Sequence, residues 1–195
     1  MATPFVQQSH GAVVVLSISA AAFAAGELWQ ALRLRGGVAP ASALGEVLFR
    51  LLFFAGILML PLGATVAPGA VVPGGVVGFV AGAVVGWLGL FLRWWCFVVL
   101  GRHFSVVLRT TAGQAVVARG PYRFLRHPSY TGLLLALLGC GVMLGNWVGL
   151  LASFAVLLAA VVYRIRIEER ALIAGLGEAY RVFAERRARL VPFVW

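Results

Sequence analysis

Five long apolar stretches run through this chain, each long enough or nearly long enough to cross a lipid bilayer as a helix. They cover residues 11–32, 44–66, 71–100, 128–145 and 147–163. A membrane-crossing helix needs about 20 mostly apolar residues, so the first three stretches are long enough and the last two are short. The chain is 62% hydrophobic and only 11% charged, which is outside the composition of soluble proteins. We therefore expect an all-α integral membrane protein with about five transmembrane helices, folded as a single membrane domain over residues 1–195.

The basic residues predict the orientation of these helices. All 16 are arginines, and they give a formal net charge of +10. Fourteen of them lie in the first and third connections or after residue 163, and Arg50 and Arg93 lie near the expected inner ends of their helices. The second connection and the short turn at 145–147 have none. Positive charge is retained on the cytoplasmic side, so we expect an N-terminus outside and a cytoplasm-facing active site in a prokaryotic cell membrane. Because topology accounts for the charge, we expect no nucleic-acid partner.

Small residues repeat along the third apolar stretch. Gly74, Gly78, Gly82 and Gly86 are spaced by four, which places them on one smooth helix face. Such a face lets two helix backbones approach closely in lipid. It predicts close packing within the molecule or, as the alternative, a homodimer through this helix.

The two cysteines carry no separate prediction of function. Cys96 and Cys140 both lie inside apolar stretches. They are too few for a zinc site, so we expect packing residues and no metal.

A count along the last two apolar stretches brings two polar segments together. His127 lies 19 residues before Asn146, and Glu168 lies 22 residues after it. At about 1.5 Å per residue, the two ends of this helical hairpin differ in depth by roughly 4 to 5 Å. His127 and Glu168 are therefore predicted to be neighbours at the inner membrane face.

The residue types at this place suggest a binding pocket. Pro128 suits the first turn of a helix and leaves His127 or Arg126 at its N-terminal cap, so that free N–H groups and nearby arginines favour an anion. Glu168 and Glu169 instead favour hydroxyl or ammonium donors.

Simpler readings of the same residues stay open. His127 suits a helix cap, and the glutamates suit ion pairs with Arg164, Arg166 or Arg170. The apolar stripe of the tail at 172–183 suits a helix that lies on the membrane, packs on the bundle or closes the pocket as a lid.

Several motifs in a fixed order resemble those of a known family. They are "LGRHFS" at 100–105, "GPYRFLRHPSYTG" at 120–132, "EERAL" at 168–172 and "GEAYRVF" at 177–183, followed by Arg189 and Pro192. In these motifs, which extend over about half of the chain, the sequence resembles the isoprenylcysteine carboxyl methyltransferase family and its relatives, the phospholipid N-methyltransferases. Those families are integral membrane enzymes that use S-adenosylmethionine (SAM). Phe183 departs from the pattern, because the family often has a second tyrosine there.

The resemblance implies roles for individual residues. The cofactor-binding residues implied by it, or by the helix N-terminus argued above, are Gly120, Tyr122, Arg126, His127, Tyr130, Gly132, Glu168 and Glu169. The resemblance places Arg102, Tyr180 and Arg186 near the methyl acceptor as catalytic residues, with Arg187 as the alternative to Arg186. Residues 101–195 would then hold SAM beneath a C-terminal amphipathic helix, and residues 1–100 would select the lipid.

The predicted function is methyl transfer from SAM to a lipophilic, membrane-embedded acceptor. The carboxylate of an isoprenylcysteine-like compound is the first expectation, because a carboxylate needs no general base. The alternatives are a phospholipid or amine N-methyltransferase, a related membrane reductase that binds NADPH, and a small transporter or assembly subunit. The sequence leaves the identity of the acceptor open.

Overall fold

The computed structural model describes residues 3–34, 43–101, 117–192 and 194–195, and the described part is almost entirely helical. Its elements are α1 (Phe5–Gln8), α2 (His10–Leu34), α3 (Ala43–Val66), α4 (Gly75–Leu100), the short 3₁₀ helix η3 (Gly120–Arg123), α5 (Pro128–Leu144), α6 (Trp147–Leu176) and α7 (Glu178–Glu185). The only β pairings within these residues are two isolated bridges. The predicted all-α class is confirmed.

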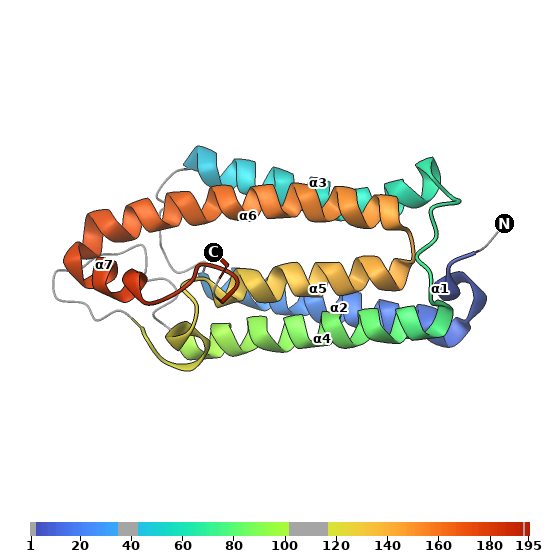
Figure 1. Ribbon diagram of the computed structural model, residues 1–195, viewed down its shortest axis with the longest axis horizontal. Helices are drawn as coiled ribbons and strands as arrows, with labels where there is room; N and C mark the ends of the chain where they lie inside the picture. The colour runs from blue at the N-terminus through green and yellow to red at the C-terminus, as the bar shows by residue number, and fades with distance from the viewer. Residues whose placement is uncertain (1–2, 35–42, 102–116, 193) are drawn as a thin grey trace.

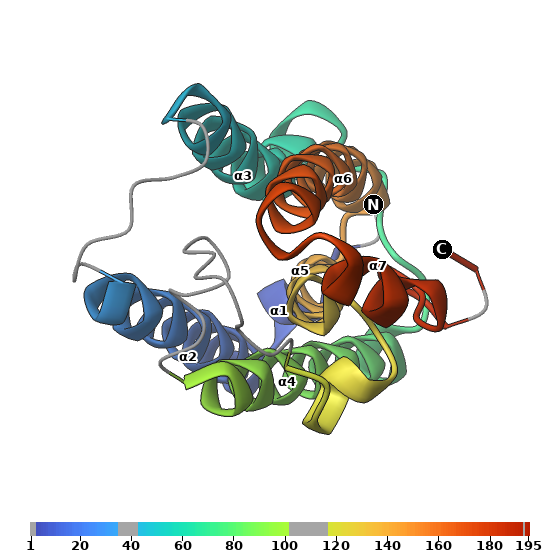
Figure 2. The same ribbon diagram turned by 90° about the vertical axis from the view of Figure 1, so that its left-hand side faces the viewer.

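The long helices lie side by side, as two pairs with α5 between them. α3 packs along α6, α2 and α5 pack on α4, and α5 also contacts α6. Figures 1 and 2 show the α3–α6 pair on one side, the α2–α4 pair on the other and α5 between them. The short α7 and the C-terminal segment fold back near the end of the bundle where α5 begins.

Four of the described helices, α2, α3, α4 and α6, are long and apolar enough to cross a membrane. α5 has 17 residues, which is at the lower limit for a crossing. The chain is thus a helical membrane protein, while a count of five crossings stays a prediction. The fifth apolar stretch does not end as a helix at residue 163. α6 continues to Leu176, because no proline interrupts it, and it ends at Gly177, which has a positive φ of 54°.

Glycines let α4 and α5 approach closely. A Cβ on Gly82, Gly89 or Gly139 would overlap backbone of the facing helix. Gly82 and Gly86 therefore face α5 of the same chain, as the packing interpretation of the glycine repeat expected. The predicted homodimer remains untested, but these two glycines are not free to form its contact.

The turn between α5 and α6 is fixed by Asn146. Its side-chain oxygen accepts a hydrogen bond from Gly149 N (2.8 Å), which caps α6, and its amide donates to Ala67 O (2.8 Å). Trp147 at this turn is half exposed. The tight antiparallel hairpin predicted from the sequence is confirmed, and it brings the start of α5 level with the last turns of α6.

Candidate functional site

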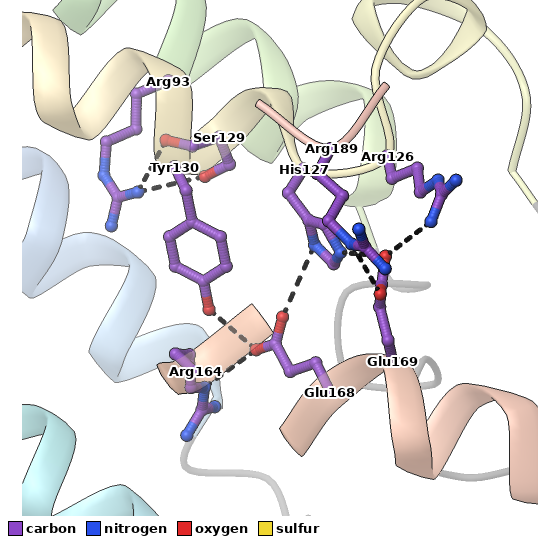
Figure 3. A network of polar contacts seen from close by, with 9 residues as sticks. All are labelled: Arg93, Arg126, His127, Ser129, Tyr130, Arg164, Glu168, Glu169 and Arg189. Carbon is purple, nitrogen blue, oxygen red and sulfur yellow. Dashed lines mark hydrogen bonds and ion pairs between the residues drawn. The ribbon is translucent and has the colours of Figure 1, made fainter. Parts of the chain in front are cut away.

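The start of α5 has the predicted geometry. His127 is the N-terminal cap residue and Pro128 occupies the first turn, where a missing N–H leaves no hydrogen bond unmade. The His127 side chain makes no capping bond; the residue is only 8% exposed, and its backbone N–H donates to Arg189 O at 3.0 Å. The imidazole therefore does not cap α5, and it points toward α6 (Figure 3).

Glu168 of α6 meets this helix start directly. Its Oε1 accepts hydrogen bonds from Tyr130 Oη at 2.7 Å and from Arg164 Nε at 2.8 Å. Its Oε2 lies 3.7 Å from His127 Nδ1. The predicted proximity of His127 and Glu168 is confirmed, and one carboxylate oxygen is fixed by two donors while the other faces the imidazole.

Glu169 lies on the other side of the same imidazole. It is 7% exposed, and its two oxygens accept from Arg126 Nη1 at 3.0 Å and Arg189 Nε at 2.8 Å. His127 Nε2 is 3.5 Å from Glu169 Oε1, which is beyond ordinary hydrogen-bond length. Figure 3 shows the histidine ring between the two carboxylates.

Arg126 joins α6 to the C-terminal segment. Besides Glu169, its guanidinium donates to Arg187 O and Ala184 O, both at 2.7 Å. Cations stabilise the free carbonyls at a helix C-terminus, and Ala184 lies in the last turn of α7. The sequence predicted Arg126 as a cofactor-binding cation, whereas in the structure its hydrogen bonds go to Glu169 and to these two carbonyls.

The C-terminal segment runs alongside the start of α5. Arg126 N donates to Ala188 O at 2.8 Å, and Thr131 Oγ1 donates to Leu190 O at 2.7 Å. α7 packs back on α6 through the buried side chains of Leu172, Tyr180 and Phe183. The apolar stripe of the tail thus packs on the bundle, one of the readings that the sequence left open.

Two buried polar atoms beside Glu169 lack a partner. Neither His127 Nε2 nor Tyr180 Oη has a hydrogen-bond partner among the described residues. Burial raises the pKa of the Tyr180 phenol well above its ordinary value, and the nearby charge of Glu169 raises it further. Buried polar groups are normally hydrogen-bonded, so these two atoms are the polar groups of the site that still need a hydrogen-bond partner.

Three other predicted residues lie against α4. A Cβ on Gly120, which has a positive φ of 58°, would come within 2.9 Å of the Val99 side chain. Tyr122 is buried with Cys96 and Leu100, and burial raises the pKa of its phenol. Gly132 faces the backbone of α4, so the contact that the structure shows for it is helix packing and not a contact with Glu168 or Glu169.

The predicted catalytic residues are only partly placed. Tyr180 is 3% exposed and belongs to the site, whereas Arg102 lies outside the described residues. Arg186 is exposed. Its neighbour Arg187 instead donates to Tyr122 O at 3.1 Å and to Phe183 O at 2.8 Å. Of the two adjacent arginines, Arg187 is the one held against the site.

Apart from the Arg164–Glu168 ion pair, which the sequence left open as an alternative and the structure confirms, the prediction missed the charged residues that support the site. Arg164 pairs with Glu46 of α3 as well as with Glu168. Arg93 of α4 is 8% exposed; its Nη2 donates to Glu27 Oε2 of α2 at 2.8 Å, and its Nη1 donates to Ser129 O and Oγ at 3.0 Å. The sequence offered one signal for them, because an ionisable residue within an apolar helix requires a partner.

The sequence comparisons point to one family of proteins. Residues 82–174 match the model of the isoprenylcysteine carboxyl methyltransferase (ICMT) family. This segment, just under half of the chain, is thus similar to the ICMT family. The matched segment contains His127, Tyr130, Glu168 and Glu169.

Curated relatives give the same family. The chain is 35% identical over 109 residues to protein-S-isoprenylcysteine O-methyltransferase B of Arabidopsis thaliana. This match covers 55% of this chain and 55% of the relative. It is 32% identical over 109 residues to the enzyme of that name from Schizosaccharomyces pombe, covering 55% of this chain and 46% of the relative. The chain thus spans about half the length of these relatives.

A shorter match and a solved structure complete the comparison. Methanethiol S-methyltransferase 1 of Bradyrhizobium diazoefficiens is 36% identical over 72 residues, which are 37% of this chain and 24% of the relative. The structure of the eukaryotic intramembrane Ras methyltransferase ICMT matches with a TM-score of 0.54 and 22% identity over 75% of this chain and 52% of that one. This likeness shows the ICMT fold.

Proposed function

We propose that this chain is a SAM-dependent methyltransferase that acts on a lipophilic, membrane-embedded acceptor. The observation that carries the proposal is the meeting of His127 and Tyr130 with Glu168 across the α5–α6 hairpin, with Tyr130 Oη 2.7 Å from Glu168. The match of residues 82–174 to the ICMT family model supports it, because the similar proteins are named as methyltransferases.

The residues present fit SAM. Its ribose hydroxyls and amino group are donors, which suit the Glu168 oxygen that faces His127 at 3.7 Å. The unpartnered His127 Nε2 and Tyr180 Oη would gain the partner that buried polar atoms require. When bound, SAM would supply an electrophilic methyl group on a positively charged sulfur.

The chain's own residues would contribute positioning and exclusion of water. Glu168 is held by Tyr130 and Arg164, and Glu169 is held by Arg126 and Arg189, so neither needs to reorient when a ligand binds. The C-terminal segment at 186–192 is hydrogen-bonded to the start of α5. Together with α7, this segment would keep water from the reacting groups. Because the pKa of Tyr180 is raised, its phenol stays protonated at neutral pH and serves as a donor and not as a base.

The first candidate for the acceptor is the carboxylate of an isoprenylcysteine-like compound. A carboxylate is already a nucleophile at neutral pH, and the curated relatives from plants and yeast carry that substrate in their names. The second candidate is a thiol, which the match to a methanethiol S-methyltransferase favours. We further propose that residues 1–100 select the acceptor, and that the site faces the cytoplasm with the N-terminus outside, as the arginine distribution predicts.

Product analysis tests the proposal. The purified protein in detergent would be incubated with SAM carrying a deuterated methyl group and with an isoprenylated cysteine, a phospholipid amine or a small thiol in parallel. Mass spectrometry should find the labelled methyl group as an ester on the isoprenylated cysteine, or on the thiol if the second candidate is right. Failure of wild-type protein to bind SAM, together with no labelled product, would contradict the proposal.

A further inference from the structure

We propose that Arg164 and Glu46 are positioning residues that fix the carboxylate of Glu168 for its ligand, so that α3 contributes to the cofactor side of the molecule. The inference rests on the proposed function. Arg164 lies one helical turn before Glu168 on α6, and Glu46 reaches it from the first turn of α3. Glu46 lies outside the segment matched by the family model.

The contacts give each residue a defined part. Arg164 Nε donates to Glu168 Oε1 at 2.8 Å, and Arg164 Nη1 donates to Glu46 Oε2. The side chains of Arg164, Glu46 and Glu168 are 17%, 23% and 19% exposed. Arg164 is therefore a mostly buried cation between two carboxylates that come from different helices.

The second carboxylate is what makes the arginine an effective positioning group. A pair four residues apart on one helix is weak by itself, because both long side chains keep their freedom. Here the guanidinium is also held by Glu46 and lies 5.5 Å from the centre of the Phe49 ring, so α3 restricts it from a second side. A restricted guanidinium, together with Tyr130, restricts the rotation of the Glu168 carboxylate.

The two carboxylate oxygens of Glu168 have different surroundings. Oε1 already accepts from Tyr130 and Arg164, and Oε2 faces His127 Nδ1 at 3.7 Å without a hydrogen bond of normal length. Glu168 would thus bind its ligand through Oε2, in an orientation that Arg164 and Glu46 set.

The experiment measures SAM binding by equilibrium dialysis with tritiated SAM on detergent-purified variants. Arg164→Gln should raise the Kd for SAM about tenfold, and Glu46→Gln should raise it about threefold. The double variant should bind no more weakly than Arg164→Gln alone, because both changes act through the same guanidinium. Arg164→Lys, which keeps the charge, should recover part of the loss.

Matched controls separate positioning from general stability. Arg166→Gln removes an exposed arginine two residues further along α6, and Arg50→Gln removes the exposed partner of Glu46, so both should keep the wild-type Kd. In turnover assays the KM for SAM should rise in Arg164→Gln while kcat and the KM for the acceptor stay near wild type. A merely structural pair would lower the melting temperature and leave the KM for SAM unchanged.

Two failures can be told apart. Wild-type affinity in both Arg164→Gln and Glu46→Gln, with weakened binding in Glu168→Gln, would overturn the positioning role and leave the proposed function standing. An inability of the wild-type protein itself to bind SAM would remove the proposed function, and the positioning role with it. If Arg164→Gln fails to fold, the Arg164→Lys and Glu46→Gln variants decide the question by the same Kd.

Discussion

Tyr130 and Glu168 are 38 positions apart in the chain, and the tyrosine hydroxyl donates a 2.7 Å hydrogen bond to the glutamate carboxylate. The bond joins the first turn of α5 to the last turns of α6, and it exists because the Asn146 turn reverses the chain between two helices. Every property that we propose for the site depends on this meeting.

Tyr130→Phe tests the contribution of this bond. Glu168 keeps Arg164 as a partner, so the carboxylate should remain in place but gain rotational freedom. We expect the Kd for SAM to rise about three- to tenfold, the equivalent of one ordinary hydrogen bond. Isothermal titration calorimetry of wild type and Tyr130→Phe in the same detergent would measure the two Kd values. An unchanged Kd would show that the hydrogen bond does not contribute to SAM binding.

Glu27→Gln tests the buried pair that links α2, α4 and α5. The change removes the charge that pairs with Arg93, a residue that is only 8% exposed. Because it leaves a buried guanidinium without its counter-charge, we expect the free energy of unfolding to fall by about 3 kcal/mol.

Arg50→Gln is the comparison for that change. The Arg50 side chain is 68% exposed, and loss of its pair with Glu46 should lower the free energy of unfolding by less than about 1 kcal/mol. Unfolding of both variants by denaturing detergent would be compared with wild type. An equal loss of unfolding free energy in Glu27→Gln and Arg50→Gln would mean that the Arg93–Glu27 pair is as solvated as a surface pair.

Gly139→Ala tests the close approach of α4 and α5. A Cβ at this position would overlap the backbone of Gly86 and the Gly82 carbonyl, so the helices must separate. We expect a loss of about 2–3 kcal/mol in the free energy of unfolding. Gly69→Ala is the control, since nothing lies within 4 Å of the added atom there and its stability should change by less than about 0.5 kcal/mol. A neutral Gly139→Ala would contradict the described packing.

Tyr180→Phe separates stability from binding. The Tyr180 hydroxyl has no hydrogen-bond partner among the described residues, so its removal should leave the free energy of unfolding of the ligand-free protein unchanged or slightly higher at neutral pH. The Kd for SAM should rise severalfold, because the variant loses a donor for the ligand. Equal SAM affinity in the two proteins would exclude the hydroxyl from the site.

The same substitution predicts a dependence on pH. Burial, followed by the charge of Glu169, raises the pKa of Tyr180 in the folded protein. The protonated phenol contributes its full share to the free energy of unfolding below about pH 10, which is the usual pKa of Tyr180 in the unfolded chain. This contribution is lost as the pH rises from there toward the higher pKa of Tyr180 in the folded protein. Tyr180→Phe should therefore gain stability relative to wild type above about pH 10. Parallel unfolding midpoints at every pH would contradict the raised pKa.

The sequence predicted the parts of the molecule that follow from counting. The five apolar stretches correspond to five helices, and the count from His127 through Asn146 to Glu168 placed two distant residues together. Both inferences depend only on helix rise and on a short turn, which are local properties. The extent of α6 was predicted less well, because the rule for membrane crossings takes no account of a helix that continues past the bilayer.

The remaining features depend on the relative rotation of packed helices. Nothing near Arg126 in the sequence indicates that carbonyls of the C-terminal segment take up its hydrogen bonds. Likewise, Gly132 belongs to the family motif but faces α4, and the pairs Arg93–Glu27 and Arg164–Glu46 join helices that are far apart along the chain. The polar network thus crosses the predicted division at residue 100, since residues of α2, α3 and α4 support the site.

Photo-crosslinking of SAM is the most direct test of the central claim, that the start of α5 and the end of α6 form one cofactor site. Ultraviolet irradiation of the purified protein with tritiated SAM, followed by proteolysis and mass spectrometry, would identify the labelled peptides. We predict label in residues 120–132 and 164–190, competed away by unlabelled S-adenosylhomocysteine and reduced in Glu168→Gln. Labelling confined to other segments, or labelling that excess S-adenosylhomocysteine does not reduce, would contradict the account.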